Sequence, residues 1–276
     1  MQSISYILSD DFLPYIVVGG LLAGLITGLL GAGGGLILVP LFLYILPMLG
    51  SQPNAVMHQA ISTSLAVMVF STFSAAYKQY VSKQLPVKIL IRWSPYVLAG
   101  TIIGSVIFPY IPDNTLKRMF ISYLIIVAIY MGLKEENRST FTSERNEISF
   151  LSNAVSGVFV GALSKLLGIG GATFTVPYYS YYNYDIKTAI ALSSAISLII
   201  SASATIAEAF SFHDTSGLAE LSQGYVNYGV LMFIAPISIY SAHYGVIINH
   251  RISQKIVKWM YIFSLLAVSA QLSYAS

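Results

Sequence analysis

Two runs of glycine interrupt apolar stretches of this chain at matching places. They lie in residues 24–40 and 161–177, which read GLITGLLGAGGGLILVP and GALSKLLGIGGATFTVP. Each glycine inside a helix costs about 1 kcal/mol relative to alanine, so we expect a helix break at each run. The backbone N–H groups that begin the next helix then attract an anion. We therefore predict a binding site for an anionic substrate at these runs. The glycines assigned to it are Gly31, Gly33, Gly34, Gly35, Gly168, Gly170 and Gly171.

Close helix packing is the alternative explanation for these glycines. Small residues at every fourth position let two helices approach closely within a membrane. Gly20, Gly24 and Gly28 follow that spacing, and we interpret them as packing residues. Packing does not require three glycines in a row, so the contiguous runs favour a ligand site.

Two pairs of small hydroxyl residues follow the glycine runs. Thr63-Ser64 lies on the apolar segment after the first run, and Ser193-Ser194 lies on the segment after the second. Such hydroxyls can donate hydrogen bonds to an oxyanion without adding charge. They can also bond to the preceding helical turn or to a neighbouring helix. Because each half of the chain supplies a pair, we assign both pairs to the substrate site.

Lys165 stands where the first copy of the motif has Gly28, three residues before the second glycine run. A lysine inside a membrane is costly and by default indicates function. One interpretation is that Lys165 balances the charge of an anionic substrate. The other is that its long side chain reaches the membrane interface.

Glu208 and His243 are the other ionisable residues that could act as a proton relay. An interfacial position fits Glu208 better, because it lies toward an acidic segment end near Asp214. Packing by a hydrogen bond suits His243 better, although histidine titrates near neutral pH. His58 lies near a segment start, and we expect it at the interface. The sequence shows no metal-ligand cluster and no nucleotide-binding motif, so we expect no metal and no cofactor.

Composition places these residues in a membrane. The chain is 56% hydrophobic and 9% charged, whereas a soluble domain carries about 25% charged residues. Long apolar runs predict an all-α integral membrane protein that crosses the cell (inner or plasma) membrane several times. We expect about eight to ten transmembrane or half-membrane helices, the second and seventh being short. The predicted apolar segments are 13–30, 36–49, 55–77, 89–109, 115–133, 150–167, 172–183, 188–211, 225–248 and 254–274.

The chain divides into a first transmembrane repeat (1–133), a hydrophilic cytoplasmic linker (134–147) and a second repeat (148–276). Basic residues of membrane proteins gather in cytoplasmic loops. The loop at 78–92 is basic, whereas its counterpart at 212–224 has no lysine or arginine. This asymmetry predicts two inverted repeats. The first dozen residues lack lysine and arginine, so we expect no cleaved signal peptide there.

The doubled glycine motif, with the paired hydroxyl residues, resembles the sulfite exporter TauE/SafE family of membrane transporters. The resemblance covers most of the chain and implies a small sulfur-containing anion as substrate, such as sulfite, thiosulfate, sulfoacetate or another sulfonate. It also implies that the two glycine loops and the hydroxyl pairs line the site. Two features depart from the pattern: Ala172 stands where the first copy has Gly35, and Lys165 is additional.

We therefore expect a secondary transporter that works by alternating access at a midplane site between the repeats. Its partners would be the lipid bilayer, the small anion and possible coupling ions, namely protons or Na⁺. It would be a monomer or a homodimer. An anion channel on the same scaffold is the alternative. A membrane-embedded enzyme is less well supported, since no histidine lies at helical spacing from a motif serine, and we expect no catalytic residues.

Overall fold

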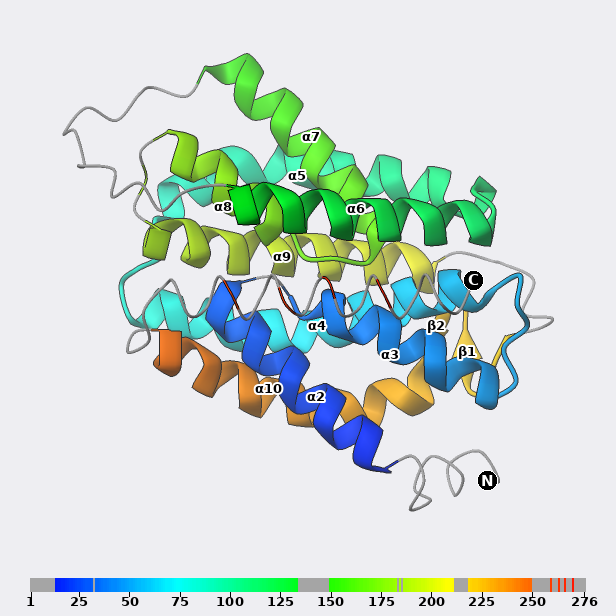
Figure 1. Cartoon of the computed structure of the whole chain (residues 1–276). Coiled ribbons are helices and arrows are strands. Elements are labelled where there is room, and N and C mark those ends of the chain that lie inside the picture. The colour runs from blue at the N-terminus through cyan, green and yellow to red at the C-terminus, as the bar shows by residue number, and fades with distance from the viewer. Residues whose placement is uncertain are drawn as a thin grey trace.

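The protein is a bundle of long helices, seen in a computed structural model (Figure 1). The structure describes residues 13–31, 33–133, 149–182, 184, 186–210 and 218–249, together with 259, 263, 266 and 270. Within this part of the chain, six helices are long and apolar enough to cross a membrane. A helix satisfies its own backbone hydrogen bonds, as lipid requires. The prediction of an all-α integral membrane protein is confirmed.

The helices follow the first nine predicted apolar segments in order. The linker at 134–147, the first dozen residues and the tenth predicted segment, apart from its four described residues, lie outside the described part of the chain. A two-residue antiparallel hairpin precedes the last described helix. The elements are α2 (Leu13–Leu30), α3 (Gly35–Met48), α4 (Val56–Val81), α5 (Val87–Ile107), η1 (Phe108–Tyr110), α6 (Asp113–Leu133), α7 (Phe150–Leu167), α8 (Ala172–Tyr181), α9 (Ile186–Ala209), β1 (Ser222–Gln223), β2 (Val226–Asn227) and α10 (Tyr228–Asn249).

Two helices are too short to cross a membrane alone. α3 has 14 residues and α8 has 10. At 1.5 Å per residue they are about 21 and 15 Å long, against a hydrocarbon core of about 30 Å. Both begin directly after a glycine run, so each run starts a helix within the bundle.

The two predicted repeats are interleaved rather than separate. α4 packs against α9 at the centre, α2 packs against α10, and α5 packs against α7. Each of these pairs joins one helix from residues 1–133 to one from residues 148–276. The α4–α5 connection and the β1–β2 hairpin lie at opposite ends of the bundle (Figure 1). The inversion of the repeats and the division into domains remain predictions.

Glycines allow α2 and α10 to touch. A Cβ on Gly28 would lie 2.6 Å from the backbone nitrogen of Val246 and 2.7 Å from the Cα of Gly245. A Cβ on Gly24 would collide with the backbone at Ser238. The packing interpretation of Gly24 and Gly28 is therefore confirmed, because backbone atoms cannot move aside as a flexible side chain can.

Gly28→Val should lower the melting temperature in detergent by several degrees. Overpacking at a close helix contact costs about 1–3 kcal/mol. The matched control is Leu22→Val on the same helix, where the side chain is exposed on the bundle surface. Equal melting temperatures for both variants would contradict the close contact of α2 and α10.

The chain has no cysteine, so single introduced cysteines can report the topology. Ser82 follows α4, and Glu220 precedes the hairpin; both are exposed. With inverted repeats, a membrane-impermeant maleimide added to intact cells should label Glu220→Cys and spare Ser82→Cys until the cells are opened. Labelling of both residues from the same side would rule out the inverted arrangement.

Candidate functional site

The first glycine run separates α2 from α3 through backbone angles that suit only glycine. Gly31, Gly33 and Gly34 have φ of 68°, 75° and 75°. Gly168, directly after α7, has φ of 66°. A residue with a Cβ pays about 1–2 kcal/mol in this left-handed region. The expected helix breaks are therefore present at both runs.

The two breaks meet inside the bundle. A Cβ on Gly35 would fall on the carbonyl oxygen of Gly168, and one on Gly33 would lie 3.3 Å from the Cα of Gly170. We call residues 31, 33–35 and 168–171 the glycine crossing. The described glycines of this crossing are all buried. The crossing brings the N-termini of α3 and α8 together from the two halves of the chain.

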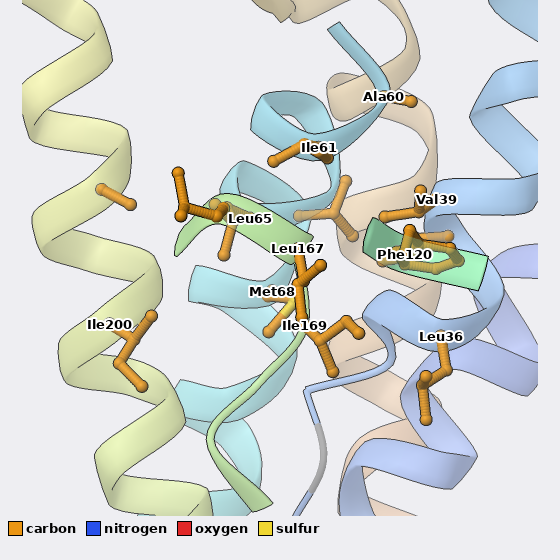
Figure 2. Close-up of a cluster of buried hydrophobic side chains, with 14 of the residues drawn as sticks. Leu36, Val39, Ala60, Ile61, Leu65, Met68, Phe120, Leu167, Ile169 and Ile200 are labelled. Carbon is orange, nitrogen blue, oxygen red and sulfur yellow. The ribbon is translucent and has the colours of Figure 1, made fainter. Parts of the chain in front are cut away.

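Apolar side chains enclose the crossing. Figure 2 shows Leu167 and Ile169, which flank Gly168, packed beside α4. All the labelled side chains of this cluster have less than a tenth of their surface exposed. Such a shell keeps water out, which strengthens any charge interaction inside. The labelled residues are Leu36, Val39, Ala60, Ile61, Leu65, Met68, Phe120, Leu167, Ile169 and Ile200.

Three of the four predicted hydroxyls lie against the crossing. Ser64 Oγ of α4 donates to the carbonyl of Gly168 at 3.0 Å. Ser193 Oγ donates to Ile190 at 2.8 Å and approaches the carbonyl of Leu30 at 3.4 Å. Ser194 Oγ also donates to Ile190, at 3.0 Å. These are the packing bonds of the alternative interpretation, so an anion would have to redirect the hydroxyls.

Thr63 does not reach the crossing in this structure. Its Oγ1 accepts a hydrogen bond of 3.0 Å from the backbone N–H of Asn227, at the end of the hairpin. Sequence reasoning missed Ser197, whose Oγ donates to the carbonyl of Gly31 at 3.0 Å. The signal was available, because Ser197 lies one helical turn after Ser193 and so shares its face.

Lys165 is wholly buried and forms an ion pair with Glu208. Lys165 Nζ lies 2.6 Å from Glu208 Oε1, and the two residues are 0% and 3% exposed. Nζ also lies 3.4 Å from Ser62 Oγ and 3.8 Å from the ring centroid of Phe108. The interpretation of Lys165 as a lysine that reaches the interface is wrong. Glu208 lies one residue before the end of α9, and its carboxylate is buried in the bundle. Its interfacial position in the membrane remains a prediction.

A second buried polar pair, His58 and Asp113, also contacts Phe108. His58 Nδ1 is 2.6 Å from Asp113 Oδ1, and the His58 ring centroid is 4.7 Å from that of Phe108. Asp113 also accepts hydrogen bonds from the N–H groups of Met57 (2.8 Å) and His58 (3.1 Å), at the start of α4. His58 is thus buried in the first turn of α4, and its expected interfacial position in the membrane remains a prediction. An acidic residue such as Asp113 is typical of a helix start, but nothing in the sequence predicts that Asp113 binds the start of α4.

His243 lies apart from these residues. It is half-buried on α10, and its ring is 5.9 Å from that of Tyr244. Its role in a proton relay remains a prediction. Among the described residues, no group of three or more histidine, aspartate or glutamate side chains could hold a metal ion.

Comparison with known proteins shows the family of this chain. The model of the family described as "Sulfite exporter TauE/SafE" matches residues 16–272. The chain belongs to this family. It is 28% identical to a probable membrane transporter protein of Methanocaldococcus jannaschii, over 90% of both chains. It is 24% identical to a probable membrane transporter protein of Haemophilus influenzae, over 85% of this chain and 88% of the relative.

A third relative, the probable membrane transporter protein YunE of Bacillus subtilis, is 24% identical over 94% of this chain and 96% of its own length. No solved structure shows significant similarity to the chain. The protein is thus a multi-pass membrane transporter in a lipid bilayer, not an enzyme.

Lys165→Met should destabilise the protein by about 3–5 kcal/mol, because it leaves the Glu208 carboxylate buried without its cation. Adding Glu208→Leu should restore most of this loss, since apolar residues often replace a buried ion pair at no cost. Melting temperatures in detergent measure both effects. Lys88→Met, at an exposed lysine of α5, is the control. A Lys165→Met variant as stable as this control would contradict the ion pair.

Proposed function

We propose that the protein is a secondary transporter of a small sulfur-containing oxyanion, such as sulfite, thiosulfate, sulfoacetate or another sulfonate. One observation carries the proposal: the two glycine breaks meet at one buried point, and a buried lysine lies beside it. Broken helices at matched positions of two repeats mark the substrate sites of many transporters. The family name, with sulfite in it, supports the choice of anion.

The crossing has the charge that an anion requires. The N-terminus of a helix carries about half a positive charge and leaves its first N–H groups without partners in the helix. Both α3 and α8 begin there, and Lys165 is one helical turn before Gly168. The glycines have no side chain to keep an anion away from the backbone, and three serines offer hydroxyls. These residues are Gly31, Gly33, Gly34, Gly35, Gly170, Gly171, Ser64, Ser193 and Ser194. Thr63 would contribute its hydroxyl only if its hydrogen bond with the N–H of Asn227 in the hairpin broke.

The burial of the site supports alternating access. The described glycines and hydroxyls of the crossing are all buried. An anion can reach them only when helices move, and the interleaved pairs α2–α10 and α5–α7 are matched units for such a motion. A channel would need a continuous polar path, whereas apolar side chains enclose this crossing.

Transport in the cell membrane has an electrical direction. Export of an anion from a cell that is negative inside is favourable by about 2.3 kcal/mol per charge per 100 mV. Uptake therefore needs protons or Na⁺ as a coupled ion. The unit of transport is one chain, because both halves of the site come from the same chain, whether the protein is a monomer or a homodimer.

Flux into proteoliposomes tests the proposal. Sulfite, thiosulfate, sulfate and sulfonates should be compared as radiolabelled substrates and as competitors. We expect saturable flux of at least one sulfur oxyanion, inhibited by related members of the panel. Flux that rises linearly with concentration would favour a channel, and no flux of any of them would reject the proposal.

Ser64→Ala should raise KM for the transported anion about two- to tenfold, which corresponds to the loss of about 0.5–1.5 kcal/mol from one hydrogen bond. Ser71→Ala is the matched control. It is also buried on α4, but its hydroxyl lies 3.3 Å from the carbonyl of Met68 in its own helix and has no other hydrogen-bond partner among the described residues. Equal KM values for both variants would remove Ser64 from the site.

A further inference from the structure

The carboxylate of Glu208 is only half satisfied. Its Oε1 binds Lys165, while its Oε2 is buried and has no hydrogen-bond partner among the described residues. Burying a charged oxygen without a partner is costly. A permanent structural ion pair would satisfy both oxygens, so the geometry favours a carboxylate that also exists in a protonated state.

The surroundings of Glu208 supply no second cation in the part of the chain that is described. The hairpin covers it: a Cβ on Gly224 would lie 3.7 Å from Oε2. Tyr225, in the same connection, is held neutral, because burial and then the carboxylates of Glu208 and Asp113 raise its pKa. The next titratable groups are His58 and Asp113, which pair with each other beyond Tyr225 and Phe108.

Lys165 links this carboxylate to the glycine crossing. Its Nζ lies 3.4 Å from the hydroxyl of Ser62 on α4. Ser62 is on α4, the helix that contacts Gly168 through Ile61 and Ser64, and Lys165 itself precedes Gly168 by one helical turn. The Lys165 ammonium group can pair with either Glu208 or an anion at the crossing. If it paired with both, two negative groups would compete for one positive charge.

We propose that Glu208 is the proton-binding residue that couples anion transport to protons. Its carboxylate and the substrate anion pair with Lys165 in turn. This rests on the proposed function. In the resting state, Lys165 and Glu208 neutralise each other. When the anion binds Lys165, the Glu208 carboxylate takes up one proton and releases the lysine. When the anion leaves, the proton leaves as well and the ion pair forms again.

The balance of charges fixes the stoichiometry. When the anion binds, the Lys165–Glu208 pair gains the negative charge of the anion and the positive charge of the proton. Both charges leave when the anion is released. One proton therefore accompanies each anion in the same direction. For a monoanion, the cycle moves no net charge; for a dianion, it moves one negative charge. With the membrane potential clamped at zero, a gradient of one pH unit then drives about tenfold accumulation of the anion.

The first measurement uses the wild-type protein in proteoliposomes with thiosulfate, which does not itself bind protons near neutral pH. Valinomycin and potassium clamp the potential, and a trapped dye reports the internal pH. Thiosulfate entering down its gradient should acidify the interior by one proton per anion. Saturable thiosulfate flux without acidification would overturn the coupling while leaving the proposed function intact. If thiosulfate is not transported, the panel member with the largest saturable flux replaces it.

The second measurement assigns the proton to Glu208. Glu208→Gln should still exchange external for internal thiosulfate, because Lys165 is free to bind it, but a pH gradient should no longer drive accumulation. Glu220→Gln, an exposed carboxylate on the same connection, should retain both. Accumulation by Glu208→Gln in response to the gradient would overturn the proposal. A folded Glu208→Gln variant that has lost exchange as well would equally overturn it, since Glu208 would then be needed for binding.

Discussion

The arrangement depends on one constraint, which is that a broken backbone inside a membrane protein must find partners. Lipid offers no hydrogen bonds, so an unpaired N–H or C=O group costs several kcal/mol there. This chain meets the requirement by placing its two breaks against one another and supplying serines from the opposite repeat. Ser64 serves the carbonyl of Gly168, and Ser197 serves that of Gly31. Each break therefore depends on the other half of the chain, which explains why the repeats interleave.

The same dependence joins stability to transport. Several contacts that hold the crossing together join the two halves, such as those of Ser64 with Gly168 and of Ser197 with Gly31. In the proposed function, a motion that opens the site must exchange some of these contacts for others. Hydroxyls suit this exchange, because they can rotate from a carbonyl to an anion without leaving a charge behind. The apolar shell around Ile169 and Leu65 keeps water from competing with the anion while this happens (Figure 2). In the proposed function, the packing interpretation of the serines and the substrate interpretation describe two states of one site.

The sequence was a good guide wherever a local rule decides the structure. Helix periods, the breaks at glycine runs and the packing of Gly24 and Gly28 all follow from the chemistry of single segments. It was a poor guide to the partners of buried charges. Lys165 and Glu208 were each considered alone, and a lone charge is most cheaply placed at an interface. Their pairing joins α7 to α9 across the bundle, and His58 likewise finds Asp113 from α6. Tertiary contacts of this kind leave no periodic trace in a sequence.

Lys165 can turn inward because of a glycine on the neighbouring helix. In the α2–α10 contact, Gly28 meets Gly245, so that a Cβ on Gly245 would lie 2.9 Å from the Cα of Gly28. In the corresponding α7–α5 contact, Lys165 replaces Gly28 but Gly104 is kept. A Cβ on Gly104 would lie 3.2 Å from the Cβ of Lys165. The second repeat thus admits a side chain at a place where the first has none, because its facing glycine leaves room. This difference between the two halves of the chain puts one positive charge near the crossing, and Glu208 neutralises that charge without filling the crossing.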